Sequence, residues 1–222
     1  LGTFGVNSGP MMAAVDEFDI TVKGKGGHAA SPHLAIDPVV ISAQVISAVQ
    51  TIISRSTDPV DKALISITKI NAGTAYNVID DQVKMGGTIR TFRRETRAYI
   101  EKRLNELCKG IADAHGAEIK IEFDLVNKYP PTINSKEETK FAANVAKDLV
   151  GDDKVITDID PSMGGEDFSY LLEKKPGSYL YLGQGDAEHS AHLHTTKYDF
   201  NDNLLPIGVN FWVDLVQKYF SK

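Results

Sequence analysis

The stretch E-F-D-I-T-V, residues 17–22, alternates apolar and polar side chains, which is the pattern of a strand with one buried face. Similar alternation occurs at residues 63–70, 82–92 and 117–126. The strands at 63–70 and 82–92 are separated by the loop 71–81, so they are predicted to pair in antiparallel fashion. The first stretch is therefore the start of a four-stranded segment.

Two amphipathic helices are predicted between these strands. Asp37 and Pro38 combine an N-cap with a proline at the first helical position, before an apolar repeat that ends at Ile53. A second repeat runs from Ile100 to Ala114, and Gly116 follows as a C-terminal cap. The order strand, helix, strand, strand, helix, strand is the split pattern of a ferredoxin-like sandwich. We predict an α/β fold with this domain at residues 14–126.

The tail of the chain, residues 127–222, has another pattern. Ser135 and Glu138 predict a capping box for a helix that extends to about Val150. The tail is also predicted to contain a short helix after residues 165–168, a buried strand at 178–182 and a helix at 203–219. With only one or two strands, the tail is expected to have no sheet of its own, so its apolar surface needs a partner.

Composition narrows the class of protein. The 222 residues are 42% hydrophobic with a net charge of −6, and no basic block indicates nucleic acid or anionic lipid as a partner. No apolar run approaches the roughly 18 residues of a membrane span, so we expect no membrane protein. The single cysteine, Cys108, fits a cytoplasmic location. The start at Leu1 without a signal peptide favours a cut chain.

Three polar residues of the predicted domain are candidate site residues. His28 follows paired glycines on a loop without apolar periodicity, as expected for a side chain presented to a ligand, although surface histidines are more common. Arg90 lies within a strand and could hold a carboxylate, or could be a solubilising charge on an edge strand. Asn77 could be only a turn residue. His33 and His115 have a surface context.

The tail adds a histidine cluster and a glycine turn. His189, His192 and His194 lie close together in sequence and could bind a metal, although a solvated polar loop also explains the spacing. Gly165 lies in S-M-G-G-E-D-F, residues 162–168, whose glycines and acidic residues also suit a helix start. The sequence contains no G-x-S-x-G, P-loop, dinucleotide or C-x-x-C motif, so serine and nucleotide chemistry are not supported.

Five motifs occur in order along almost the whole chain: residues 2–33, which end in G-K-G-G-H-A-A-S-P-H, then G-T-A-Y-N-V-I, G-G-T-I-R-T-F, M-G-G-E-D-F and H-L-H-T-T-K-Y-D-F-N-D. Together they resemble the dinuclear-metal amidohydrolases and carboxypeptidases. That family includes aminoacylase, hippurate hydrolase, auxin-conjugate hydrolases and N-acetyldiaminopimelate deacetylase. The hippurate-hydrolase-like branch is most similar.

The resemblance implies a domain organisation. Residues 14–126 would be a lid and dimerisation domain inserted into a larger zinc-peptidase-like catalytic domain. Residues 1–13 would be a remnant of that catalytic domain, and residues 127–222 its C-terminal part. The protein would be a homodimer joined through the lid.

The resemblance also implies a role for each candidate residue. His28 matches the lid histidine that reaches into the partner's active site and stabilises the tetrahedral oxyanion. Asn77, Arg90 and Gly165 would bind the substrate. His194 matches the C-terminal metal ligand, whereas Thr196 stands where the family usually has proline.

The implied reaction is hydrolysis of the amide bond of N-acyl amino acids or small peptides with two divalent metal ions, Zn or Mn, and a glutamate as general base. The segments that would supply most metal ligands and this glutamate are missing from the sequence. We therefore expect the chain to be inactive alone, and its missing half to be removed or to lie on a separate chain.

Two alternatives remain. The chain could be a non-catalytic dimerisation or binding module without a metal centre, or an isolated metal binder that uses the three histidines of the tail.

Overall fold

The computed structural model describes residues 1–126 and 128–221 of the chain. These residues form two compact units. We call residues 13–131 together with 163–166 the insert unit. The terminal unit comprises residues 1–12, 132–162 and 167–222.

The insert unit contains a four-stranded sheet in the order β5-β7-β3-β8. Its strands are β3 (Ala14–Lys23), β5 (Ala63–Asn71), β7 (Gln82–Thr91) and β8 (Glu118–Phe123). All neighbouring strands are antiparallel. The four predicted strands are therefore confirmed, although β3 begins before residue 17 and β8 is shorter than the predicted 117–126.

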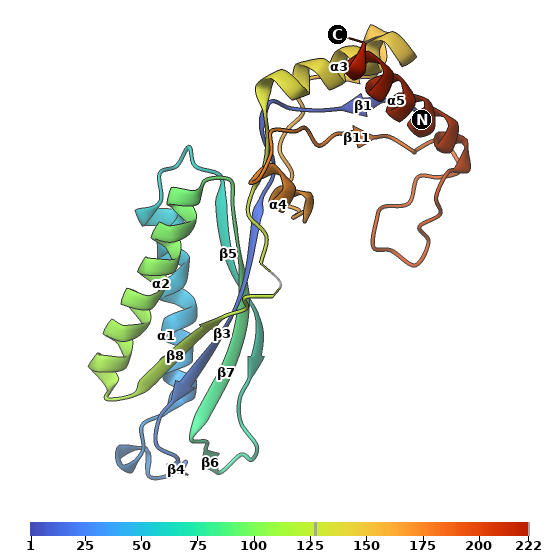
Figure 1. Cartoon of the computed structure of the whole chain (residues 1–222). Coiled ribbons are helices and arrows are strands. Elements are labelled where there is room, and N and C mark those ends of the chain that lie inside the picture. Colours follow the sequence, from blue (N-terminus) through green and yellow to red (C-terminus); the bar gives the residue numbers. More distant parts are fainter. Residues whose placement is uncertain (127, 222) are drawn as a thin grey trace. The chain divides into compact units, whose positions relative to one another are not determined.

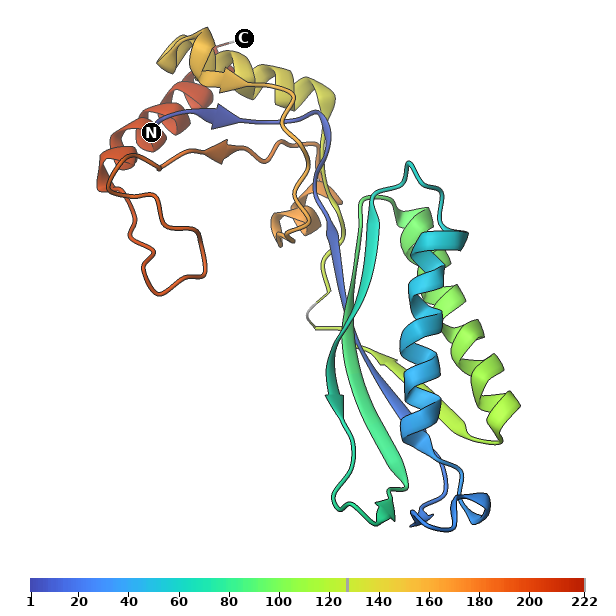
Figure 2. The same cartoon turned by 180° about the vertical axis from the view of Figure 1, so that it is seen from behind.

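Helices α1 (Pro38–Thr51) and α2 (Arg94–His115) cover one face of this sheet (Figures 1 and 2). The predicted caps are confirmed, because Asp37 Oδ1 accepts the Val39 N–H at 2.8 Å and Gly116 adopts φ 65°. Between the helices and the sheet lies a core of mostly aliphatic side chains, including Phe18, Ile20, Ile41, Val45, Ile65, Met85, Ile89, Ile100 and Leu104. Cys108 belongs to this core, and burial raises the pKa of its thiol to about 11.

The segment Pro38–Ser56, α1 and the π-helical turn that follows it, is long and apolar enough to cross a membrane by length and composition. Its inner face packs in the core of the insert unit through Ile41, Val45 and Val49. Core helices can have the same length and composition, and one face of this segment is buried in the insert unit.

The terminal unit has a small sheet. Among the described residues, the strands of the tail pair only with strands of residues 1–12, so the tail has no sheet of its own, as expected. The central strand is β1 (Phe4–Gly5), which pairs with β10 (Val155–Ile156) and β11 (Tyr181–Leu182). The strands at residues 4–5 and 155–156 were not predicted, because each has only two residues, too few to produce an alternating pattern. The predicted strand at 178–182 is correspondingly short.

The remaining elements of the terminal unit are the paired strands β2 (Gly9–Met12) and β9 (Thr132–Asn134), and the helices α3 (Lys136–Val150), α4 (Phe168–Leu172) and α5 (Leu205–Phe220). The helix after Ser135 is confirmed, but its capping box is not formed. The Ser135 hydroxyl instead accepts the Gly177 N–H at 3.2 Å.

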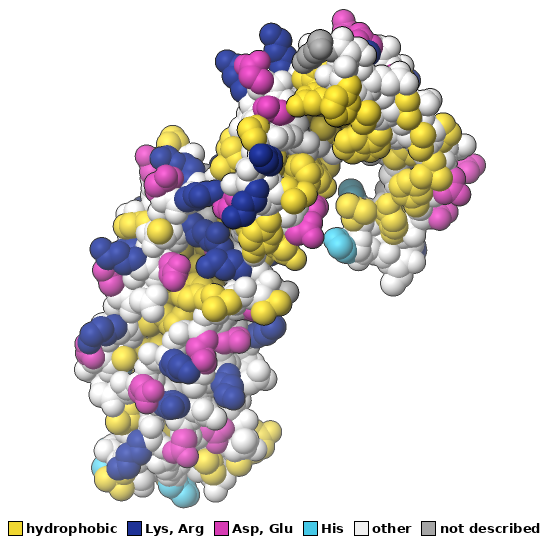
Figure 3. Space-filling view, viewed as in Figure 1, with side chains coloured by type: hydrophobic (Ala, Val, Ile, Leu, Met, Phe, Trp, Pro, Cys, Tyr) yellow, Lys and Arg dark blue, Asp and Glu magenta, His cyan; other side chains and the backbone are white. Residues whose placement is uncertain are grey.

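The outer surface of α5 is strongly apolar. Apolar atoms gather over this part of the terminal unit in Figure 3. The exposed side chains are Leu205, Val209, Trp212, Val213, Val216, Tyr219 and Phe220. Exposed apolar patches of this kind mark surfaces that other protein parts cover.

Candidate functional site

His28 lies at one end of the insert unit, on the two-residue strand β4 (Gly27–His28). This strand pairs with β6 (Val78–Ile79), so that His28 faces Val78. The preceding turn packs tightly, because a Cβ on Gly26 would lie 2.8 Å from both Asp81 Oδ1 and the Ile79 carbonyl oxygen. Gly26 therefore allows the backbone before His28 to lie close to Ile79 and Asp81.

The His28 side chain is exposed, and its ring orientation is fixed by a hydrogen bond. The Ala30 N–H donates to His28 Nδ1 at 3.0 Å. Since Nδ1 accepts this bond, the neutral ring carries its proton on Nε2. His28 therefore presents an N–H donor at the end of the insert unit.

Asn77 lies beside His28, directly before β6. The Ala29 N–H donates to the Asn77 carbonyl oxygen at 3.0 Å. The side chain of Asn77 is exposed. The structure thus brings these two sequence-predicted site residues together.

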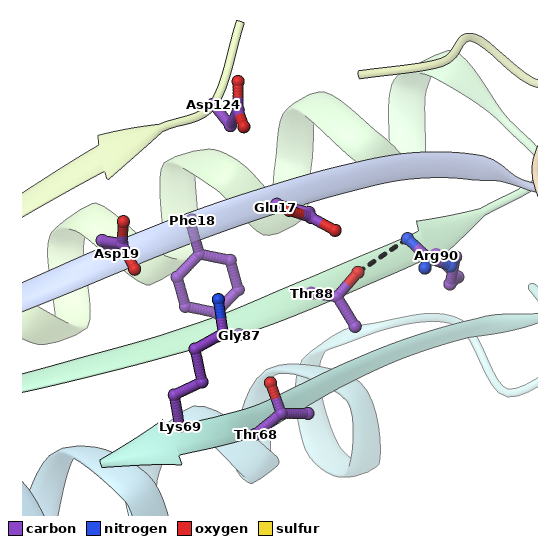
Figure 4. A pocket seen from close by; sticks show the side chains of 9 residues that line it. All are labelled: Glu17, Phe18, Asp19, Thr68, Lys69, Gly87, Thr88, Arg90 and Asp124. Carbon is purple, nitrogen blue, oxygen red and sulfur yellow. Dashed lines mark hydrogen bonds between the residues drawn. The ribbon is translucent and has the colours of Figure 1, made fainter. Parts of the chain in front are cut away.

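Arg90 lies on β7, which is an interior strand, so the edge-strand interpretation of this residue is wrong. Its side chain is half-buried on the sheet face opposite the helices, in a pocket of about 420 Å³ (Figure 4). The pocket is lined by Glu17, Phe18, Asp19, Thr68, Lys69, Gly87, Thr88, Arg90 and Asp124.

The guanidinium of Arg90 is only partly satisfied. Its Nη1 donates to Thr88 Oγ1 at 2.6 Å and to the Ile89 carbonyl oxygen at 3.4 Å. Burial lowers the pKa of Arg90, while Glu17 and Asp16 act in the opposite direction at longer range. Within the described part of the chain, Arg90 forms no ion pair. A partly desolvated cation with spare N–H groups is suited to a ligand carboxylate.

Arg90 is not brought together with His28 and Asn77. It pairs with Val15 near one end of β3, whereas the His28 hairpin follows the Lys23–Gln82 pair at the other end. Eight residues of extended strand separate Gln82 from Arg90, which corresponds to roughly 26 Å. One insert unit therefore has two separate candidate binding sites, one at each end of its sheet.

Gly165 packs against β3. A Cβ at this position would overlap Val15 Cγ2, and the adjacent Gly164 carbonyl oxygen accepts the Ala13 N–H at 3.0 Å. The expectation that the glycines start a helix with acidic residues in its first turn is wrong, since α4 begins at Phe168 and has none there. The geometry gives Gly165 a packing role.

His194 lies on the exposed loop between β11 and α5. Among the described residues it is the one non-glycine residue with positive φ, 62°. Of the three histidines of the tail, His189 has its Nδ1 hydrogen-bonded to Asp186 Oδ1 at 2.9 Å. The described residues contain no group of three side chains able to hold a metal. The exposed imidazole of His194 remains a candidate for one metal ligand, and the described residues do not supply a complete site.

Sequence reasoning missed the residues that close this loop. Asn201 Nδ2 donates to the Gln184 carbonyl oxygen at 3.1 Å and to Asp186 Oδ2 at 2.6 Å. Asn201 is completely buried. Asn201 belongs to the motif H-L-H-T-T-K-Y-D-F-N-D, but bonds between residues so far apart leave no local spacing in the sequence that would assign it this role.

The sequence matches Peptidase family M20/M25/M40 over residues 3–218. It is 38% identical over 218 residues to a hippurate hydrolase of Campylobacter jejuni, covering 98% of this chain and 56% of that protein. It is 35% identical to an N-acetylcysteine deacetylase of Bacillus subtilis, covering 97% and 54% of the two chains. The chain thus spans about half the length of these relatives.

The fold is similar to that of a solved Bacillus subtilis structure described as a dinuclear metal binding peptidase of the M20 family. The TM-score is 0.76 at 31% identity, and the match covers 96% of this chain and 52% of that one. This likeness supports the mixed α/β architecture of both units.

Proposed function

Because the chain belongs to Peptidase family M20/M25/M40, we propose that it forms part of a metal-dependent hydrolase that cleaves the amide bond of N-acyl amino acids or small peptides. The relatives named as a hippurate hydrolase and a deacetylase support this substrate class. The observation that carries the proposal is the exposed His28, held with Nε2 as its donor.

The proposal assigns a role to each unit. The insert unit is a ferredoxin-like lid and dimerisation domain, which its strand order β5-β7-β3-β8 and its two helices support. The terminal unit is part of the catalytic domain, whose remainder would cover the apolar surface of α5. The proposed setting is the cytoplasm.

The lid residues act on the substrate by hydrogen bonding. His28 Nε2–H donates to the oxygen that becomes negatively charged when the amide carbonyl is attacked, and Asn77 stands beside it. Arg90 holds the substrate carboxylate in its pocket. Since His28 and Arg90 lie at opposite ends of the sheet, we propose that they serve different active sites of a homodimer.

Two divalent ions, Zn or Mn, would supply the activated water in the whole protein. His194 would be one of their ligands. The other ligands and the general base would come from sequence outside this chain, so the chain alone is expected to be inactive. Gly165 is proposed to border the substrate through its backbone.

A second candidate function is a dimerisation or binding module without catalysis. It is favoured by the lack of a group of three metal-binding side chains among the described residues. The module would keep the lid and would release no amine from an amide.

The deciding experiment measures hydrolysis of N-acetyl and N-benzoyl amino acids by the full-length protein with added Zn or Mn, and by its variants His28→Ala and His194→Ala. Loss of one hydrogen-bond donor to an oxyanion typically lowers kcat about 10²–10³-fold. We expect such a decrease for His28→Ala with an almost unchanged KM.

The control is His33→Ala, because His33 is an exposed histidine at the same end of the insert unit. Full activity of both variants would contradict the proposal, and no hydrolysis by the parent protein would favour the binding module.

A further inference from the structure

We infer that Asn201 is a positioning residue for His194, acting with Gln184 and Asp186 to close the loop that carries this histidine. The inference rests on the proposed role of His194 as a metal ligand. It concerns Gln184, Asp186 and Asn201, which lie at the two ends of the loop and to which the sequence assigned no role.

The side chain and backbone of Asn201 join both ends of the loop. Its backbone N–H donates to Gln184 Oε1 at 3.1 Å, and its Nδ2 donates to the Gln184 carbonyl oxygen at 3.1 Å. The two residues are 17 positions apart. Asn201 is the donor and Gln184 the acceptor in both bonds, and together they fix the separation of the loop ends.

Asp186 extends the closure into the first turn of the loop. Its Oδ2 accepts Asn201 Nδ2 at 2.6 Å, while its Oδ1 accepts the backbone N–H groups of Glu188 at 2.9 Å and His189 at 2.8 Å. Hydrogen bonds from N–H groups to a charged carboxylate are stronger than bonds between neutral groups, so they hold the backbone of this turn in place. The loop start is therefore tied to Asn201.

Asn201 also connects the loop to the helix that follows it. Its Oδ1 accepts the Asn203 N–H at 3.1 Å, which caps the helical turn that leads into α5. The amide thus uses both donor hydrogens and its oxygen, and it is completely buried. Removal of its donors would leave buried acceptors without partners, which is costly.

Among the described residues, His194 forms no hydrogen bond or ion pair through its side chain. It is exposed and adopts the left-handed backbone conformation. Such a conformation costs about 1 kcal/mol or more in a residue with a side chain and persists only where surrounding contacts over-determine it. The nearest local bonds join Thr195 Oγ1 to the His192 carbonyl oxygen and Tyr198 N–H to the Thr195 carbonyl oxygen. The closed loop ends therefore supply the remaining constraint.

The test uses the full-length protein with Asn201→Asp, which replaces the donor facing Asp186 by a second carboxylate. Asn203→Asp is the matched control, because it adds the same charge two residues away at an exposed position. Two quantities are measured: Zn²⁺ affinity by competition with a chelating dye, and hydrogen exchange of the amides of residues 186–200 in the metal-free protein.

For Asn201→Asp we expect faster exchange confined to the loop and Zn²⁺ affinity reduced about tenfold or more, the usual effect of losing a residue that orients a ligand. Asn203→Asp should change neither quantity by more than about twofold. Equal behaviour of the two variants would overturn the inference. So would a loop that loses protection while the Zn²⁺ affinity stays the same.

A second pair of variants distinguishes loss of loop positioning from general destabilisation of the protein. Asp186→Asn should weaken Zn²⁺ binding, because two amide N–H₂ groups would then face each other. The double variant Asp186→Asn with Asn201→Asp re-forms that bond in the opposite direction and should regain part of both the affinity and the protection. Failure to regain either would count against the inference.

His194→Ala distinguishes this inference from the proposed function. If His194→Ala leaves Zn²⁺ affinity unchanged, the proposed ligand role fails, and with it the metal part of the inference. If His194→Ala weakens binding but Asn201→Asp does not, only the inference fails.

Discussion

Gly165 and Arg90 illustrate how single residues determine the candidate site. Gly165 leaves room for Val15 of β3, and no side chain fits between them. Arg90 is a half-buried cation whose hydrogen bonds within the described chain use only Nη1. Gly165 matters because it has no side chain, and Arg90 matters because some of its N–H groups have no partner among the described residues.

We expect Gly165→Ala to destabilise the protein by roughly 1–3 kcal/mol, because the added Cβ overlaps Val15 Cγ2. Chemical denaturation measures this change. Val15→Ala in the same protein should recover part of the loss. Gly110→Ala is the matched control, since nothing lies within 4 Å of a Cβ there, and alanine should stabilise α2 by roughly 0.5–1 kcal/mol. Equal stability of both glycine variants would refute the packing role.

Arg90→Lys should raise KM for substrates with a free carboxylate by roughly tenfold to a hundredfold, because a lysine ammonium cannot form the two parallel bonds of a guanidinium. The value of kcat should change much less. Steady-state kinetics on an N-acyl amino acid and on its carboxamide provide the comparison. A parallel rise of KM for the carboxamide would show that Arg90 does not recognise the carboxylate.

At the scale of elements, a buried ion pair fastens α2 to β3. Arg97 Nε and Nη2 donate to the two oxygens of Asp16 at 2.6 Å and 2.5 Å, and both side chains are largely buried. A pair in this geometry is strongly destabilising to break on one side only, because an uncompensated charge stays buried.

We therefore expect Arg97→Met to lower the free energy of unfolding by about 3–5 kcal/mol, since it leaves Asp16 buried without its partner. The double variant Asp16→Asn with Arg97→Met should be less destabilised than Arg97→Met alone. Denaturant titration of the three proteins gives both numbers. If the double variant is the least stable, the destabilisation comes from lost packing and not from the unpaired carboxylate.

The loop that carries His194 should depend on pH. The hydrogen bond to Asp186 raises the pKa of His189, so the contribution of this contact is present below the ordinary histidine value and is lost as pH rises through the raised one. Bonds from His189 lower the pKa of Asp186 to about 2, so its contribution is lost only as pH falls toward that value. Protection of amides 186–200, corrected for intrinsic exchange, should be greatest between about pH 4 and 6.5. His189→Gln should remove the decrease at higher pH, whereas the exposed His192→Gln should not.

The long elements were predictable from sequence, and the short ones were not. Ten-residue strands such as β3 and β7 repeat their alternation often enough to be recognised, and Asp37 and Gly116 gave the helix ends. The terminal sheet escaped because it is assembled from distant pairs of residues. His28 and Asn77 were predicted as site residues because each lies in a short sequence motif. The closure by Asn201 could not be predicted, because it depends on a contact across 17 residues.

At the scale of the whole molecule, the separation of His28 from Arg90 along the insert unit predicts shared active sites. If His28 acts in its partner's site, full-length His28→Ala and His194→Ala proteins should each be inactive, but their heterodimer should contain one site with both residues intact. Random mixing of the two subunits should then restore about a quarter of the parent activity, because half of the dimers are mixed and each has one working site. Activity after unfolding and refolding the mixture measures this. If His28 acts within its own subunit, mixing restores nothing.

The segment that forms the sheet of the insert unit begins and ends at neighbouring positions, which are joined by hydrogen bonds. Val15 and Tyr129 exchange two backbone hydrogen bonds of 3.0 Å, so the chain leaves the sheet beside the place where it entered. A domain whose two ends lie close together can be inserted into another domain without separating the residues that it joins. Exchange of residues 16–128 for the equivalent segment of a relative should therefore be tolerated. Lids of different length or sequence could then diversify during evolution while the surrounding chain keeps its own fold.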